Sequence, residues 1–172
     1  MSQQPTAQQQ LSAWLDDAYA MERGLVSILE NHAGHLEDVM PAAAARLREH
    51  ITETRLHATR LEQCLALLDT APSTVKSTMS SMIGTVEGAA TAFFRDHVVK
   101  DLLADYASEH FEVGCYQALV SAANVLGLPE IAELCQQNLD EDLDMAMWIF
   151  EQLPAVAIAN AVRPVVVESP RS

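Results

Sequence analysis

The sequence predicts an all-α protein, a bundle of four long helices arranged as two hairpins that a long, partly helical crossover joins. Of 172 residues, 49% are hydrophobic and only 6 are Gly and 7 are Pro, so the chain can bury a core. Aromatic residues are only 5%, and Val, Ile and Thr are outnumbered by Ala, Leu, Glu, Gln and Met, a balance that favours helix over sheet. The apolar residues also follow the period of a helix in four segments.

The first predicted helix starts at Leu11, after a Gln-rich stretch over residues 1–10 that we expect to be a disordered tail. From there, one side of the helix repeats every three or four residues. This stripe consists of Leu11, Trp14, Ala18, Glu22, Leu25, Leu29, His32 and Leu36. Pro41 either ends this segment or opens the next one.

The second predicted helix covers about residues 42–68 and ends in the Pro-containing turn that follows. Its inward stripe is Leu47, His50 or Ile51, Thr54, His57 or Ala58, Leu61, Cys64 or Leu65, and Leu68. At about 100° per residue, Glu53 lies about 40° from His57 and about 60° from His50, so these three polar side chains point the same way. Residues 73–97 have a weaker helical pattern with many Ser, Thr and Gly, and they supply the crossover.

The second hairpin starts with a helix over about residues 98–126. Its inward stripe is Leu102, Tyr106, Glu109, Val113, Tyr116 and Val120. A Gly-Leu-Pro break separates it from the last helix, which ends near Gln152. The inward residues of this last helix are Ile131, Leu134, Asn138, Glu141, Met145, Ile149 and Leu153. Because Pro154 is expected to close the helix, we predict one bundle domain over residues 11–153 and a C-terminal tail over residues 154–172.

The net charge of the chain limits the kinds of partner that it is expected to bind. The chain has 24 Asp and Glu against 10 Lys and Arg, a formal net charge of −14. Such a surface repels nucleic acid phosphates and anionic lipid, so we expect neither a nucleic acid nor a membrane as partner. The sequence contains no run of 18 apolar residues and no secretory signal, and we therefore expect a cytoplasmic protein that attracts cations.

Glutamates at inward positions are the informative feature of the four helices. Glu22 and Glu109 lie in the middle of apolar stripes. Glu53 and Glu141 lie at stripe edges, and Glu112 follows Glu109 by one turn. The spacing repeats, since the glutamates of the first hairpin are 31 residues apart and those of the second hairpin are 32 apart. Two hairpins related by a pseudo-twofold axis bring one glutamate from each helix to the same level of the bundle.

Buried carboxylates need compensation, because each unpaired buried charge costs several kcal/mol. Arg23, Arg55 and Arg60 are expected to point away or to flank the core, so divalent metal ions are the remaining partner. Two such ions against four or five carboxylates leave the site near neutral. Oxygen ligands with one or two imidazoles suit Fe or Mn, and helical bundles hold metal pairs with Glu and His from facing helices.

Each candidate ligand also has a structural explanation that the sequence leaves open. A single inward Glu can be hydrogen-bonded to Tyr or Trp instead. A structural role explains His57 as well as a metal bond does, and it is favoured for His50 and His110. The sequence therefore does not decide which of these three supplies nitrogen. Surface positions are expected for His32, His35 and His97, and a solvated acidic face for Asp140, Asp142 and Asp144.

Four motifs stand at these positions in order. They are Leu15-Asp-Asp-Ala-Tyr-Ala-Met-Glu22-Arg, His50-Ile-Thr-Glu53-Thr, Glu109-His-Phe-Glu112-Val-Gly-Cys-Tyr116 and Asn138-Leu-Asp-Glu141-Asp. Together, over about residues 11–153, they resemble the YciF-type bacterial stress proteins of the ferritin-like superfamily, and the third motif is the most specific. The resemblance implies a ferritin-like four-helix bundle, often dimeric, with a di-metal site at the matching glutamates.

From the residues and the resemblance together we expect a di-iron carboxylate protein, with manganese as the alternative metal. The expected ligands are Glu22, Glu53, His57, Glu109, Glu112 and Glu141. Glu53 and either Glu141 or Glu112 are expected to bridge the two ions. Tyr residues near the site are more simply explained as packing.

The expected activity is ferroxidase- or peroxidase-type redox chemistry with dioxygen or peroxide in oxidative or metal stress. The chain has no CxxC pair for an iron domain of its own, so a reductant must come from elsewhere. We also expect a homodimer. The alternative hypothesis is a non-enzymatic stress-response or assembly protein that keeps the fold with little or no metal, and the missing His on the last helix supports it.

Overall fold

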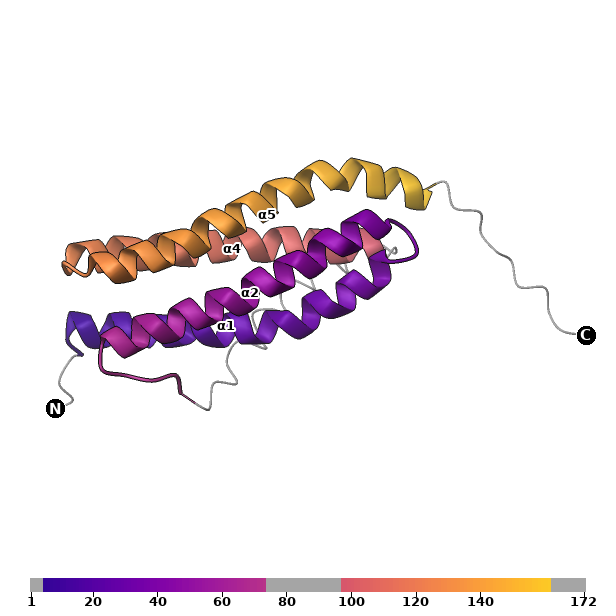
Figure 1. Ribbon diagram of the computed structural model, residues 1–172. Helices are drawn as coiled ribbons and strands as arrows, with labels where there is room; N and C mark the ends of the chain where they lie inside the picture. Colours follow the sequence, from indigo (N-terminus) through magenta and orange to yellow (C-terminus); the bar gives the residue numbers. More distant parts are fainter. Residues whose placement is uncertain (1–4, 74–96, 162–172) are drawn as a thin grey trace, which may run out of the picture.

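The computed structural model describes residues 5–73 and 97–161, and in these ranges it contains four helices and no strand (Figure 1). The helices are α1 (Ala7–Leu36), α2 (Pro41–Leu67), α4 (His97–Val125) and α5 (Pro129–Ala161). α1 and α2 form one hairpin and α4 and α5 form the other, with α1 packed against α4 and α2 against α5. The predicted all-α four-helix bundle is therefore confirmed. Nearly all of the predicted crossover over residues 73–97 lies outside the described residues.

α1 begins at Ala7, four residues before the predicted start at Leu11. A capping box explains the difference. The Thr6 hydroxyl accepts a hydrogen bond from the Gln9 backbone N–H at 3.2 Å, and the Thr6 N–H donates to the Gln9 side chain at 2.9 Å. These bonds satisfy donors at the helix start that have no partner inside the helix. The predicted disordered tail is therefore wrong for residues 7–10.

α5 continues through Pro154 and ends at Ala161, so the helix end predicted near Gln152 is wrong. A proline inside a helix removes one backbone hydrogen bond and clashes with the preceding turn. Packing compensates here, because Val156 is fully buried and Leu153 packs against the same apolar cluster. Figure 1 shows α5 bending along its last, yellow part, as expected for a helix with an internal proline.

Both hairpin turns use the residues that the sequence marks as breaks. Pro41 is the first residue of α2, where its missing N–H costs little because first-turn donors have no helical partner. It therefore opens the second helix and does not end the first. Between α4 and α5, Gly127 has a φ of 69°, a left-handed conformation that favours glycine.

The core has two apolar clusters with a polar layer between them. One contains Leu15, Leu61, Leu119 and Ile131, and the other contains Leu29, Leu47, Leu102 and Ile149. The buried polar residues of the described ranges are Glu22, His32, His50, Thr54, His57, Asp105, Glu109, Glu112, Asn138 and Asp142. Most of them lie along the helices between the two clusters, which keep water from both sides of the layer. None of the helices in the described ranges combines the length and apolarity needed to cross a membrane.

Candidate metal centre

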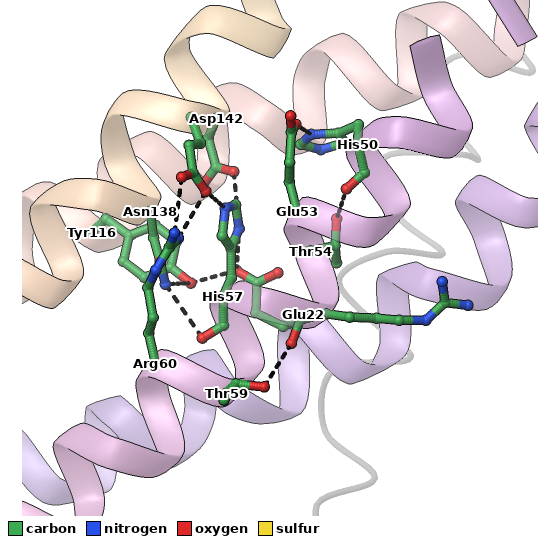
Figure 2. Close-up of polar contacts among 12 residues, drawn as sticks. Glu22, His50, Glu53, Thr54, His57, Thr59, Arg60, Tyr116, Asn138 and Asp142 are labelled. Atoms are coloured by element: carbon green, nitrogen blue, oxygen red, sulfur yellow. Dashed lines mark hydrogen bonds and ion pairs between the residues drawn. The ribbon is translucent and has the colours of Figure 1, made fainter. Parts of the chain in front are cut away.

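Two sets of ligand-type side chains converge in the buried layer. Figure 2 shows the first of them, in which Glu22 and Asp142 lie beside His57. Glu22, His57 and Asp142 form one set, and His50, Glu109 and Asp142 form the other. Within each set, one ligand atom per residue lies within 4.8 Å of the others, and every member is buried. All four described helices contribute, α2 with both imidazoles. Asp142 belongs to both sets, as a carboxylate between two adjacent ion positions would.

The first set has the spacing that a single ion requires. His57 Nδ1 lies 3.6 Å from Glu22 Oε1 and 3.3 Å from Asp142 Oδ1. Metal bonds of about 2.0–2.2 Å put neighbouring ligand atoms roughly 3–3.5 Å apart. An ion therefore fits between these three side chains with little movement of any of them.

Both imidazoles are held from outside by a carboxylate. His57 Nε2 lies 2.8 Å from Glu141 Oε2, and His50 Nδ1 lies 2.9 Å from Glu53 Oε2. Each ring turns its other nitrogen inward, and that of His50 lies 2.9 Å from Glu109 Oε1. Such an outer carboxylate fixes the orientation of an imidazole ligand and raises its basicity.

Arginines neutralise these two outer carboxylates. Arg60 donates from both guanidinium nitrogens to Glu141 at 2.7 and 2.9 Å, and Arg46 donates to Glu53 at 3.2 and 3.3 Å. Hydrogen bonding from His50, aided by Arg46, lowers the pKa of Glu53 to about 2. Burial alone would raise the pKa of Glu141, but its bonds from Arg60 and His57 outweigh burial and lower it. The sequence prediction that arginines leave the glutamates unpaired is therefore wrong for these two.

A hydrogen-bonded chain ties Glu22 to α5. The buried Tyr116 hydroxyl donates to Glu22 Oε1 and accepts from Asn138 Nδ2 at 3.0 Å. Asn138 Oδ1 in turn accepts from Arg60 at 2.9 Å. One oxygen of Glu22 thus has a fixed partner, while the other, Oε2, has no hydrogen-bond partner.

The inner carboxylates are compensated only in part. Glu22 Oε2, Glu109 Oε2 and both oxygens of Asp142 are buried without a hydrogen-bond partner, and so is His57 Nδ1. Burial and mutual repulsion raise the pKa of Asp142, Glu109 and the nearby Glu112. Buried acceptors without partners are rare because each costs about 1–3 kcal/mol. This set of oxygens and imidazole nitrogens therefore fits a group of positive charge.

In the metal-free protein, where the inner nitrogen of His50 contacts Glu109, the imidazole of His50 is cationic. Burial alone would lower the pKa of His50, but Glu109 and Glu53 raise it to about 10. At neutral pH both ring nitrogens then carry a proton and donate to a carboxylate each. A metal ion at Nε2 must displace that proton, so metal binding here is coupled to proton release.

The predicted ligands separate into two groups. Glu22, His57, Glu109 and Glu112 are buried in the polar layer. The side chains of Glu53 and Glu141 are each 34% exposed and belong to neither set of converging atoms. Asp142, which the sequence did not select, lies where a bridging carboxylate was expected from Glu53, Glu141 or Glu112.

Two side chains, those of Asp142 and His32, lie elsewhere than the sequence predicted, and the sequence left the roles of His50 and His110 open. The solvated face predicted for Asp142 is wrong, since this residue is 1% exposed. The surface position predicted for His32 is also wrong, because it is buried against Asp105. His50, left open by the sequence, is buried in the site, whereas His110 is exposed with its ring 4.5 Å from that of Tyr106.

A bundle of two helical hairpins, in which buried carboxylates of α1, α4 and α5 meet two imidazoles of α2, is the architecture of the ferritin-like proteins. The chain belongs to the DUF892 family, a domain of unknown function, which it matches over residues 6–162. The resemblance to YciF-like proteins seen in its motifs is thereby confirmed.

Solved structures agree with this assignment. A protein from Xanthomonas campestris has 31% sequence identity and a TM-score of 0.75, and the match covers 89% of this chain and 94% of that one. The Escherichia coli stress protein YciF has 17% identity and a TM-score of 0.76, with 93% and 100% of the chains covered. Desulfovibrio desulfuricans bacterioferritin, a protein with a diiron site, has 16% identity and a TM-score of 0.70, with 88% and 82% covered. At these low identities the last two support the ferritin-like fold alone.

Proposed function

We propose that the protein holds two metal ions that share Asp142 as a bridging ligand. Glu22 and His57 bind the first ion, and His50 and Glu109 bind the second. The observation that supports this most directly is the position of Asp142 in both sets of converging atoms, with each of its oxygens buried and without a hydrogen-bond partner. Glu112, buried and close enough to repel Glu22 and Asp142, is a further carboxylate for the pair.

The charges of the proposed site balance. Two divalent ions bring four positive charges against the buried carboxylates of Glu22, Glu109, Glu112 and Asp142. Oxygen ligands with one imidazole for each ion suit iron or manganese. Thiolate ligands, which would favour zinc, are absent from this ligand set. The ligand set therefore differs from the sequence prediction by including His50 and Asp142 and by giving Glu53 and Glu141 an orienting role.

We propose redox chemistry of the ferroxidase or peroxidase type for this site. Metal ions that change oxidation state supply the electrons for the reduction of dioxygen or peroxide. The chain positions the ligands, since Glu141 and Glu53 orient the two imidazoles and Tyr116 holds Glu22. The apolar clusters flank the layer on either side along the bundle, and a pocket lined by Arg23, Arg55 and Glu62 reaches Glu22. A role in oxidative or metal stress, with an external reductant, follows from this chemistry.

A non-enzymatic role is the second candidate function. It is favoured by the absence of an imidazole on the described part of α5, which supplies only carboxylates and Asn138 to the layer. On this hypothesis, protonation of the inner acids replaces metal as the means of reducing their charge. The bundle would then act as a structural or assembly protein.

Metal content separates the two functions. The untagged protein is produced with iron or manganese supplied, and the ions per chain are counted by mass spectrometry. We expect about two iron or manganese ions per chain. Asp142→Asn should lose both ions, whereas Asp144→Asn, an exposed neighbour on the same helix, should keep them. A wild-type chain without bound metal, or an Asp142→Asn chain that keeps both ions, would contradict the proposal.

A further inference from the structure

A second group of imidazoles and carboxylates lies between α1 and α4, away from the candidate metal centre. His32 and His35 stand one turn apart on α1, and His97, Asp101 and Asp105 stand at intervals of four residues on α4. Four residues are about one turn, so the three α4 residues share one face of the helix. Asp101 precedes Glu109 by eight residues, about 12 Å along the helix axis, so the proposed ligands lie about two turns from the centre, with Asp105 between them.

The contacts in this group are close. Asp105 Oδ1 lies 2.7 Å from His32 Nδ1, and Asp101 Oδ1 lies 3.6 Å from the other nitrogen of that ring, Nε2. Asp101 Oδ2 lies 2.6 Å from His35 Nδ1. The ring of His97 is 6.3 Å from that of His35, measured between centroids. A single carboxylate, that of Asp101, therefore stands between two imidazoles.

We propose that this group is a binding site for one divalent transition-metal ion, with His32, His35 and Asp101 as ligands. His97 is the fourth ligand, and Asp105 orients His32 from outside. The ion is additional to the pair proposed above, and the site does not depend on that pair.

The distances support an ion at this position. The 3.6 Å between His32 Nε2 and Asp101 Oδ1 is beyond a hydrogen bond and close to the roughly 3.4 Å between two ligands of a tetrahedral ion. Two imidazoles on one tetrahedral ion have ring centres roughly 5 Å apart, so the rings of His35 and His97, at 6.3 Å, must approach each other by about 1 Å. The 2.6 Å contact between His35 Nδ1 and Asp101 Oδ2 must also open when the ion enters. The His35 side chain is 43% exposed, which leaves room for these movements.

Asp105 gives His32 the support that metal-bound imidazoles have. It is buried and bonded to Nδ1, so the ring presents Nε2 to Asp101. Its second oxygen, Oδ2, is buried without a hydrogen-bond partner, and burial raises the pKa of this acid. A carboxylate bonded to the far nitrogen of a histidine ligand is the usual outer partner in metal sites.

The donors indicate which ions bind. Three imidazole nitrogens and one carboxylate suit Zn²⁺ or Co²⁺, whereas Ca²⁺ and Mg²⁺ prefer oxygen ligands. The alternative explanation is that His32 and His35 are protonated and form ion pairs that join α1 to α4. That explanation predicts no metal binding at this position.

The test uses Co²⁺, whose visible absorption reports its ligands, and the untagged full-length chain. In a Glu109→Gln/Asp142→Asn background, which lacks the proposed pair, we expect calorimetry to find one Co²⁺ per chain. His35→Ala and Asp101→Asn in this background should weaken that binding at least about tenfold. His110→Ala, the removal of another exposed imidazole of α4, is the matched control and should bind as tightly as the background.

The outcomes separate this inference from the proposed function. No Co²⁺ binding in the background, or equal binding by the His35→Ala chain, would overturn the inference and leave the shared Asp142 site untouched. If circular dichroism shows the background unfolded, the wild-type and His35→Ala chains are compared instead. The wild type should then bind one more Co²⁺ than His35→Ala, and equal numbers would overturn the inference.

Discussion

The inner and outer carboxylates of the polar layer have opposite environments. Glu53 and Glu141, the outer pair, are partly exposed, each bonded to an arginine and an imidazole, and their pKa values are lowered. The inner acids Glu109, Glu112 and Asp142 are buried, have no arginine among the contacts above, and have raised pKa values. The bundle thus neutralises its outer acids with its own arginines and leaves the inner acids without such partners, which is the basis of the proposed metal site.

The difference between the two groups assigns them different roles. A carboxylate that is already paired with arginine has lone pairs committed to hydrogen bonds and is a poor direct ligand. It remains well suited to hold an imidazole in place. Glu109 and Asp142 have buried oxygens without a hydrogen-bond partner, and the fold opposes their ionisation. A divalent ion would offset both costs. Metal binding should therefore depend more strongly on the inner acids than on the outer ones, and the stability of the metal-free protein should respond oppositely to changes in the two groups.

The largest expected effect is on metal affinity. Asp142→Asn should abolish the binding of both ions, whereas Glu141→Gln should weaken binding by about 10–100-fold, as loss of an outer partner does. Calorimetric titration of the metal-free chains with Mn²⁺ measures both. If Glu141→Gln loses metal as completely as Asp142→Asn, Glu141 is a direct ligand and the division into inner and outer acids fails.

The stability of the metal-free protein should fall as pH rises. The pKa values of Asp142 and Glu112 are raised in the fold, and that of His50 is raised to about 10. Raised folded-state pKa values give stability that is present below the unfolded values, near 4 for the acids and 6.5 for histidine, and is lost at higher pH. Thermal unfolding of the metal-free chain between pH 5 and 9 should show a falling Tm. A Tm that rises over this range would contradict the uncompensated inner acids.

Replacing an inner acid by its amide should stabilise the metal-free protein. Glu112→Gln removes a buried carboxyl whose ionisation the fold opposes, and we expect a gain of about 1–3 kcal/mol at pH 7. For a chain of this length each kcal/mol is about 2–4 °C in Tm. Glu53→Gln, the matched change in an outer acid, should instead lower Tm. A clear loss of stability in Glu112→Gln would count against an uncompensated cluster.

The smallest expected effects concern the two arginines. Arg60 is mostly buried and makes three hydrogen bonds, two to Glu141 and one to Asn138. Arg60→Ala should cost about 1–3 kcal/mol. Arg46 makes longer bonds at a more exposed position, and Arg46→Ala should cost less than about 1 kcal/mol. Urea unfolding of both variants measures the difference, and equal losses would argue against the stronger anchoring of Glu141.

The four-helix bundle could be predicted from the sequence because four segments have apolar residues at helical spacing and because Pro and Gly residues mark the breaks between them. The errors lie at helix ends. A capping box at Thr6 started α1 without apolar residues, and the packing of Val156 carried α5 through Pro154. Neither the capping box nor the packing of Val156 can be seen in the helical spacing of apolar residues, on which the prediction was based.

The site was harder to predict, because adjacent acids fit the same stripe. On α5, two inward stripes are possible between Asn138 and Met145. One passes through Asp142, in steps of four and three residues, and the other passes through Glu141, in steps of three and four. A rotation of 100° decides which acid is buried, and only contact with the other helices sets that rotation. The same uncertainty hid His50, which shares its turn with Ile51, and both proved to be buried.

The position of bound manganese tests the central claim most directly. Crystals grown with Mn²⁺ should give two anomalous density peaks, about 3.5–4 Å apart, each within bonding distance of one Asp142 oxygen. One peak should also lie beside His57 and the other beside His50. Peaks bound to Glu53 and Glu141 without Asp142, or no peak in the polar layer, would contradict the account.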